Sequence, residues 1–197
     1  MSPPLDIKII PRHGFGEGRT ARRRAVPPLH LGGLLLLLAL GFVVSGPLQA
    51  EVNPGDPFPT LAATGFEGGA LPVMAGKVVL VDFWASWCAP CKSSFPAYAR
   101  LNAEYAPRGL VIVAVSEDEN RTAYESFVAR LHPPFAALND KWQQLARLVK
   151  VPAMPTCYLL GRDGRVRSVH QGFHGDSTER ELRQELDRLL AAQTITP

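Results

Sequence analysis

Cysteine is scarce in this sequence, with three among 197 residues. A small exported scaffold held together by disulfides would have more cysteines, in an even number and at wider spacing. No second Cys-x-x-Cys pair accompanies Cys88 and Cys91, so a zinc site built from two such pairs is not predicted. We therefore expect packing to hold the fold together and the cysteines to serve chemistry.

Long hydrophobic runs are also few. The longest, "LHLGGLLLLLALGFVV" from Leu29 to Val44, is shorter than the about 20 residues that span a bilayer. Three arginines, Arg22 to Arg24, precede it, and Gly46-Pro47 and the small residue Ala50 follow it. A basic region, a short apolar core, a helix breaker and a small residue in this order are typical of an export signal.

Residues 1–50 are therefore predicted to be an export signal, with disordered residues before its basic region. Leu48 does not match the small residue preferred three places before a cut after Ala50. An N-terminal membrane anchor that is retained thus stays open as an alternative. Either way, the rest of the protein is expected in the periplasm or another extracytoplasmic space, in the second case tethered to the inner membrane.

The mature part lacks an excess of positive charge. Residues 1–50 hold six of the 21 Lys and Arg and two of the 18 Asp and Glu, which leaves 15 and 16 in residues 51–197, a net charge of −1. No basic patch for nucleic acid is predicted from this balance. About 147 residues is the usual size of one domain and enough to bury a core.

The hydrophobic pattern from residue 51 onward predicts a mixed α/β sheet. Continuous apolar runs predict strands buried on both faces, and an Asp163-Gly164 turn predicts a hairpin. The predicted strands are Val78–Trp84, Leu110–Ser116, Thr156–Leu160 and Arg165–His170. The predicted helices are Pro90–Tyr105, Tyr124–Leu131, Trp142–Val149 and one from Asp176. Crossover helices imply parallel early strands, and the hairpin implies an antiparallel late pair.

Three segments carry weaker predictions. The Pro- and Gly-rich stretch from Val52 to Lys77 indicates an extended lead-in with a short hairpin. The acidic run Glu117 to Glu119 is interpreted as a solvated turn that starts a helix. Asp176 and Glu179 have the spacing of a capping box. Each of these is an expectation about local structure.

The pair Cys88 and Cys91 is predicted to lie where a buried strand passes into a helix. Cys88 would stand at the helix N-terminus, where free N–H groups and the helix dipole stabilise a thiolate and lower its pKa. Pro90 suits the first turn of that helix. Cys91, one turn later, should be more buried. Cys88 is therefore predicted to attack a partner disulfide, and Cys91 to release it.

Alternative uses of the pair are open at this point. A copper chaperone without turnover could add His170 or His174 to the two thiols. A structural disulfide is disfavoured because so short a loop restricts little chain entropy. A peroxidase would need Pro at position 81 and Thr or Ser at position 85 for a peroxidatic pattern ending at Cys88, and the chain has Val81 and Ala85.

The run "VDFWASWCAPCK" closely resembles the thioredoxin active-site segment, and "VPAMPTCYLLGRDGRV" resembles the segment with that fold's cis-proline and closing hairpin. The lead-in "NPGDPFPTLAATGFEG" and the exported N-terminus resemble the extracytoplasmic branch of TlpA/ResA/CcmG type. The resemblance covers roughly residues 52–172. It implies an α/β thioredoxin fold over residues 51–197: a mixed central sheet with helices on both faces, an N-terminal extension and an inserted strand and helix.

The resemblance also implies roles for particular residues. Cys88 would be the nucleophile and Cys91 the resolving thiol of a redox-active disulfide, with Asp82 as a buried proton carrier and Pro155 as the cis-proline. The residues expected to contact substrate are Trp87, Ala89, Pro90 and Met154. Cys157 is expected to be a buried, inert thiol. No metal or other cofactor is expected.

The activity implied is that of a thiol-disulfide oxidoreductase, mainly a reductase of cysteine-containing proteins in cytochrome c maturation or copper-site assembly. Its electrons would come from a thiol reductant embedded in the membrane. Two positions depart from the branch, where many members have Glu in place of Ser94 and a neutral residue in place of Asp82.

Overall fold

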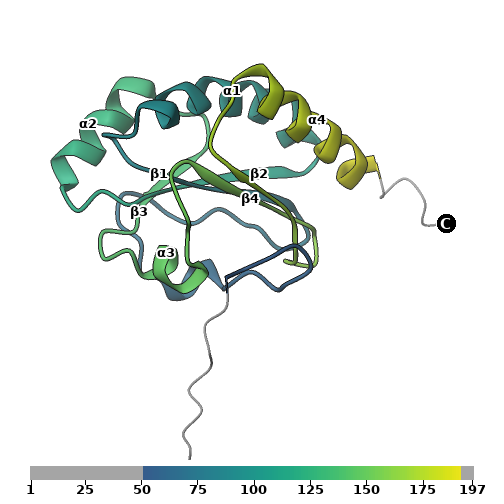
Figure 1. The fold of residues 1–197 in the computed structure, drawn as a ribbon, viewed down its shortest axis with the longest axis horizontal. Helices are drawn as coiled ribbons and strands as arrows, with labels where there is room; N and C mark the ends of the chain where they lie inside the picture. Colours follow the sequence, from purple (N-terminus) through teal and green to yellow (C-terminus); the bar gives the residue numbers. More distant parts are fainter. Residues whose placement is uncertain (1–50, 192–197) are drawn as a thin grey trace, which may run out of the picture. The chain divides into compact units, whose positions relative to one another are not determined.

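The computed structural model describes residues 51–191, which form a five-stranded sheet with helices on both faces (Figure 1). The strands are β1 (Val78–Trp84), β2 (Leu110–Ser116), β3 (Ala136–Asn139), β4 (Thr156–Leu160) and β5 (Val166–Gln171). The helices are η1 (Leu61–Ala63), α1 (Ala89–Tyr105), η2 (Ala106–Arg108), α2 (Arg121–Leu131), α3 (Gln144–Val149) and α4 (Asp176–Ala191).

The strand order is β3-β2-β1-β4-β5. β1 and β2, and β2 and β3, run parallel, whereas β4 is antiparallel to both β1 and β5. The mixed sheet predicted from the sequence, parallel early and antiparallel late, is confirmed. It places β1 at the centre, with all seven of its residues buried.

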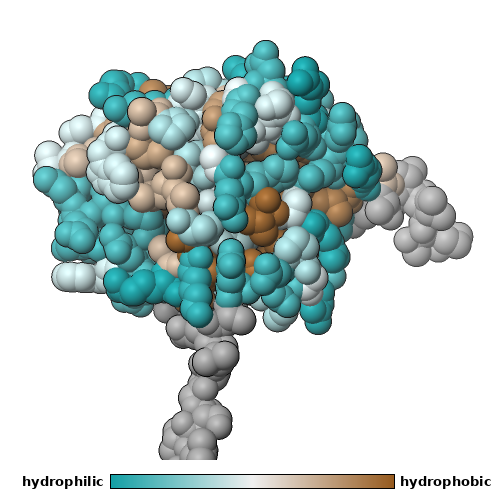
Figure 2. Space-filling model, in the orientation of Figure 1, coloured by the Kyte–Doolittle hydropathy of each residue, from teal (hydrophilic) through white to brown (hydrophobic). Residues whose placement is uncertain are grey.

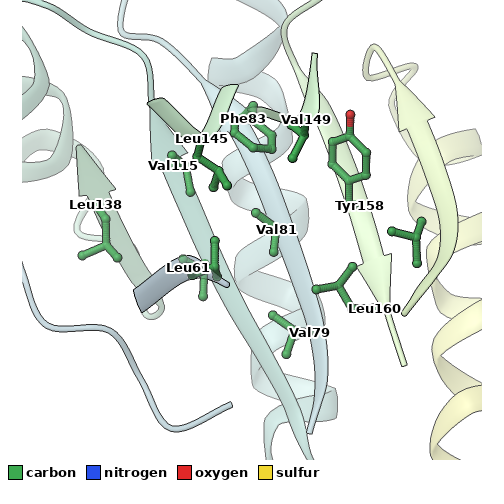
Figure 3. Packing of buried hydrophobic residues seen from close by; sticks show 12 residues of the cluster. Leu61, Val79, Val81, Phe83, Val115, Leu138, Leu145, Val149, Tyr158 and Leu160 are labelled. Carbon is green, nitrogen blue, oxygen red and sulfur yellow. The ribbon is translucent and has the colours of Figure 1, made fainter. Parts of the chain in front are cut away.

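β1 contributes to both faces because its side chains alternate. Val79, Val81 and Phe83 face the side covered by α3 and the N-terminal lead-in (Figure 3). Val78 and Leu80 face the other side and pack with residues of α1 and α4. Figure 1 shows α1, α2 and α4 together on that second face. The central strand is thus shielded from water on both sides, as expected for a strand that is apolar apart from Asp82.

α1 follows β1 after a short loop and contains two prolines, one in its first turn and one in its interior. Pro90 lies in the first turn, where no helical hydrogen bond is lost. Pro96 lies inside the helix and is exposed, and α1 nevertheless continues to Tyr105. The side chains of Cys91, Tyr98 and other residues on the opposite face of α1 are buried.

The structure differs from the predicted elements on the third strand and the third helix. The resemblance implied an inserted strand, but the sequence pattern did not locate β3: its sequence, Ala-Ala-Leu-Asn, has little β-propensity, and it forms by pairing with β2. The helix predicted from Trp142 begins only at Gln144, and the Trp142 side chain is exposed. Asp140 explains the later start, because its carboxylate accepts hydrogen bonds from the N–H groups of Gln144 and Leu145 at 2.9 and 2.7 Å.

Two further local predictions were wrong. The lead-in forms no hairpin with itself; it makes single antiparallel bridges, Pro57 with Arg165 and Glu67 with Asn139. Glu179 closes no capping box at the start of α4, because its carboxylate accepts hydrogen bonds from Arg100 and Arg183 instead. In both cases a longer-range partner replaces the local one.

The predicted export signal or anchor at residues 1–50 lies outside the described residues. Within residues 51–191, no helix is long and apolar enough to cross a membrane. On the face drawn in Figure 2, hydrophilic residues predominate and hydrophobic ones appear in small separate areas. Among the large hydrophobic side chains that are exposed, Trp87 lies directly before Cys88.

Candidate active site

Cys88 and Cys91 form a disulfide at the junction between β1 and α1, with an S–S distance of 2.00 Å and a Cα–Cα distance of 5.3 Å. Cys88 is the N-cap residue of α1, and its Sγ accepts a hydrogen bond from the Cys91 N–H at 3.3 Å. Cys88 is 5% exposed and Cys91 is fully buried. The predicted placement is confirmed, and a thiolate at Cys88 would meet both this N–H and the positive end of the helix dipole.

The loop that delivers Cys88 is fixed to the end of β2 by Asp118. The Ser86 N–H and Oγ donate to the Asp118 carboxylate at 2.9 and 2.8 Å, and the Ser116 Oγ donates to it at 2.8 Å. Asp118 is buried. The prediction of a solvated turn was wrong for Asp118, because its carboxylate accepts hydrogen bonds from three protein donors and not from solvent. Asp118 therefore holds the residues just before Cys88 in place.

Met154 and Pro155, directly before β4, are joined by a cis peptide bond. The Met154 side chain packs against the buried cluster that contains Cys88, Cys91 and Trp84. Pro155 is buried, and its carbonyl accepts a hydrogen bond from the Gly172 N–H at 2.7 Å. The cis-proline implied by the resemblance is thus confirmed as a structural feature.

The surface around Cys88 is formed by residues that the sequence singled out as substrate contacts. Trp87 is 68% exposed, and Ala89 and Pro90 are exposed as well. Trp84, in contrast, is fully buried and packs on Phe95 and other aromatic rings. An exposed tryptophan beside a redox-active sulfur offers a flat apolar surface to a partner chain.

Asp82 is fully buried in β1. The Tyr98 hydroxyl donates to its Oδ1 at 3.0 Å, and its Oδ2 has no hydrogen-bond partner among residues 51–191. Burial raises the pKa of the Asp82 carboxyl well above its usual value, and the hydrogen bond from Tyr98 opposes this rise. Tyr98 projects from the same face of α1 as Cys91, two turns later. Sequence analysis identified Tyr98 only as a core residue and missed its bond to Asp82.

Cys157 lies directly opposite Asp82 in the pairing of β1 with β4. It is a free, buried cysteine. Burial, and then the nearby Asp82 carboxylate, raise the pKa of the Cys157 thiol above its usual value. A thiol that stays protonated is a poor nucleophile, so Cys157 agrees with the predicted inert role.

Glu117 is the largest departure from the sequence-based expectation. It is 5% exposed, and neither carboxylate oxygen has a hydrogen-bond partner among the described residues. Its N–H donates to the Trp84 carbonyl at 2.8 Å, which extends the pairing of β1 with β2 by one residue beyond Ser116. Burial, followed by the charges of Asp140 and Asp118, raises the pKa of Glu117 to about 8, against an opposing effect of Arg147.

This burial predicts a pH-dependent effect of Glu117→Gln on stability. Since the folded-state pKa lies above the unfolded value of 4.5, folding of the wild type costs progressively more as the pH rises from about 4.5 to 8. Gln does not titrate, so the variant should gain on the order of 3 kcal/mol relative to wild type between pH 5 and pH 8. Urea denaturation at both pH values measures this change. The exposed Glu119→Gln is the matched control, and a pH-independent difference for Glu117→Gln would contradict the assigned burial.

The histidines considered for a copper site do not converge on the dithiol. His170 and His174 have the spacing of a metal-binding pair. The His170 ring nevertheless lies against α4, with Nε2 3.1 Å from Glu185 and Nδ1 3.6 Å from Glu181. No group of three or more His, Cys, Asp or Glu residues within residues 51–191 is placed to hold a metal ion.

A Cys-x-x-Cys disulfide at the start of α1, in a buried cluster against which Met154 of the cis Met154-Pro155 bond packs, defines a thioredoxin-like thiol-disulfide oxidoreductase. Comparison with known proteins agrees. Residues 54–169 match the AhpC/TSA family. The thiol-disulfide oxidoreductase ResA of Bacillus anthracis is 30% identical over 161 residues, which cover 79% of this chain and 91% of ResA.

Two other relatives extend this comparison. The thioredoxin-like protein YneN of Bacillus subtilis is 30% identical over 168 residues, covering 80% of this chain and 96% of YneN. A crystal structure assigned to a DsbE thiol:disulfide interchange protein of Chlorobium tepidum is 34% identical, with a TM-score of 0.66, covering 71% of this chain and 99% of that one. The chain therefore belongs to the AhpC/TSA family and is a thiol-disulfide oxidoreductase of the TlpA/ResA/CcmG type. These names support the oxidoreductase prediction over the peroxidase alternative.

Proposed function

We propose that this protein is an extracytoplasmic reductase of protein disulfides that works through the Cys88–Cys91 dithiol. The observation that carries the proposal is the position of this pair: Cys88 caps α1 with its Sγ on the Cys91 N–H, while Cys91 is fully buried. One sulfur can therefore meet a partner protein, and the other meets only Cys88. This division of labour is what a two-step exchange requires.

In the first step, the Cys88 thiolate attacks one sulfur of a substrate disulfide. A bond forms between Cys88 and that sulfur, the substrate S–S bond breaks, and the other substrate sulfur leaves as a thiolate. In the second step, Cys91 loses its proton and attacks Cys88 Sγ, which releases the first substrate sulfur. Two electrons have then passed to the substrate, whose thiolates take up two protons, and Cys88–Cys91 is oxidised.

Asp82 is proposed to accept the proton that Cys91 loses. Both side chains are fully buried, so water does not supply a base there. The pKa of Asp82, raised by burial, brings it toward the range in which a carboxylate can accept and return a proton at neutral pH. Tyr98, which donates to Asp82 Oδ1, is proposed to position this carboxylate.

The substrate is proposed to bind as an extended strand beside Met154, whose backbone precedes the cis bond. Trp87, Ala89 and Pro90 would contact the same strand from the side of α1, since all three are exposed next to Cys88. Pro155 would fix the direction of the Met154 backbone. The substrates proposed are the cysteines of apocytochrome c before haem attachment, or those of a copper site during assembly.

The location and electron source follow from the sequence. Residues 1–50 are proposed to export the protein to the periplasm or another extracytoplasmic space, or to anchor it in the inner membrane, with residues 51–197 as the thioredoxin-like domain. A membrane-embedded thiol reductant is proposed to reduce Cys88–Cys91 after each turnover. The test of the proposal is reduction of insulin disulfides by the full-length protein with dithiothreitol as electron source. Catalysis above the dithiothreitol background is expected, and its absence would contradict the proposal.

A further inference from the structure

A pocket of about 490 Å³ is lined by Met154, the residue before the cis-proline, and by neither cysteine of the redox pair. Its apolar wall comes from α3 and the segment before the cis-proline. The lining residues are Glu117, Gln143, Ala146, Arg147, Lys150, Val151, Pro152, Ala153 and Met154. Its volume lies in the range of sites that bury a ligand group.

The pocket adjoins the redox site through two connections. Met154 lines it and also packs on the cluster that contains Cys88 and Cys91. Glu117 lines it and donates its backbone N–H to Trp84, four residues before Cys88. A substrate strand that passes Met154 would therefore carry the side chain of a residue near its cysteine over this pocket.

Glu117 is the acidic residue among those that line the pocket. It is 5% exposed, and both of its carboxylate oxygens are without a hydrogen-bond partner in the part of the chain that the structure describes. Buried polar groups almost always have partners, because leaving one unpaired costs free energy. The neighbouring carboxylates are satisfied: Asp118 binds Ser86, and Asp140 binds the first N–H groups of α3. Among the residues that line the pocket, Glu117 alone has buried side-chain oxygens without a hydrogen-bond partner in the described part of the chain.

We propose that this pocket is a specificity subsite that receives a Lys or Arg side chain of the protein substrate, close to its reacting cysteine, with the cationic group on Glu117. The inference rests on the proposed function of Cys88–Cys91. A long basic side chain matches this lining: its aliphatic stem can pack on Ala146, Val151 and Met154, and its charged head can donate hydrogen bonds to Glu117.

Two neighbouring carboxylates favour a cation at Glu117. Asp140 and Asp118 both act on Glu117 as negative charges, and Arg147 acts in the opposite direction. Arg147 and Lys150 line the pocket and are exposed, so solvent and salt screen their charges more strongly than those of buried groups. They should weaken the binding of a basic side chain without preventing it.

The test uses the reduced full-length protein, at a pH above 8 so that Glu117 is ionised, and short peptides with one cysteine, activated as a mixed disulfide with thionitrobenzoate. Attack by Cys88 on the peptide sulfur releases thionitrobenzoate, which is followed by absorbance. Four positions are varied one at a time, two before and two after the cysteine. Each carries Lys, norleucine or Glu, while the other positions are Ala or Ser. Norleucine retains the aliphatic stem of Lys and lacks its charge.

At one of these positions, the peptide with Lys should react with a second-order rate constant about 10- to 100-fold higher than that of the peptide with norleucine, as expected for a charge-assisted contact. Glu117→Gln should remove this preference and leave the norleucine peptide unchanged, whereas Glu119→Gln, which alters an exposed neighbour, should retain it. Arg147→Gln should increase the preference. Equal rates for Lys and norleucine at every position, or a preference that survives Glu117→Gln, would overturn the inference. If no peptide reacts faster with wild type than with Cys88→Ser, the proposed function itself fails.

Discussion

Replacing Cys88 with Ser is expected to abolish disulfide reduction, lowering turnover by at least about a thousandfold, because the attacking sulfur is removed. Replacing Cys91 with Ser is expected to give a different defect. Cys88 can still attack, but nothing releases the substrate, so the protein should accumulate as a covalent mixed disulfide. Insulin turnover measures the first effect, and intact-mass spectrometry under non-reducing conditions measures the second.

The difference between the two variants follows from their positions. Cys88 caps α1 and is 5% exposed, whereas Cys91 is fully buried. Cys157→Ala is the matched control for loss of a cysteine, since that thiol is buried away from the substrate surface and stays protonated. We expect it to retain turnover. Substrate trapped on Cys91 in a Cys88→Ser variant would reverse the assigned roles.

Replacing Asp82 with Asn is expected to slow the release step by about a hundredfold, the usual contribution of a positioned proton acceptor. The first attack, which needs no proton transfer at Cys91, should be little affected. Rapid mixing followed by acid quench separates formation of the mixed disulfide from its decay. In the wild type, the decay rate should rise with pH as Asp82 loses its proton, and this rise should be missing in Asp82→Asn.

Tyr98→Phe distinguishes a proton acceptor at Asp82 from a merely structural role of that residue. The Tyr98 hydrogen bond lowers the pKa of Asp82, against the larger effect of burial. Removing the hydroxyl should therefore raise that pKa further and move the rise in decay rate to higher pH, with the ring of Tyr98 still filling its place. A decay rate with the same pH dependence in wild type, Asp82→Asn and Tyr98→Phe would rule out Asp82 as the proton acceptor.

The features that could be predicted from sequence are those that adjacent residues determine. The strands Val78–Trp84 and Leu110–Ser116 were predicted with their observed bounds because each is a run of mostly β-branched and apolar residues, with Asp82 the one charged residue in the first. The disulfide site was predictable because a Cys-x-x-Cys at a strand-to-helix junction combines a motif with its structural context. Resemblance to thioredoxin then supplied the cis-proline, which no local pattern shows.

The features that were missed depend on distant contacts. Glu117 and Asp118 were predicted to be solvated because acidic side chains usually face water. In the structure, Asp118 is buried where it binds Ser86, and Glu117 is buried beside residues of α3. Tyr98 has the spacing of a core residue, and only the folded sheet brings Asp82 to its hydroxyl. β3 was missed because its four residues owe their conformation to β2.

The most direct test of the central claim is the reduction potential of Cys88–Cys91 in the full-length protein, equilibrated against glutathione buffers and read by alkylation and mass spectrometry. Among the described residues, Cys88 Sγ accepts one hydrogen bond, from the Cys91 N–H, which favours a moderately rather than strongly stabilised thiolate. We expect a potential near that of thioredoxin, about −270 mV, as befits an electron donor. A potential near that of DsbA, about −120 mV, would make the protein an oxidant and contradict its assignment as a reductase.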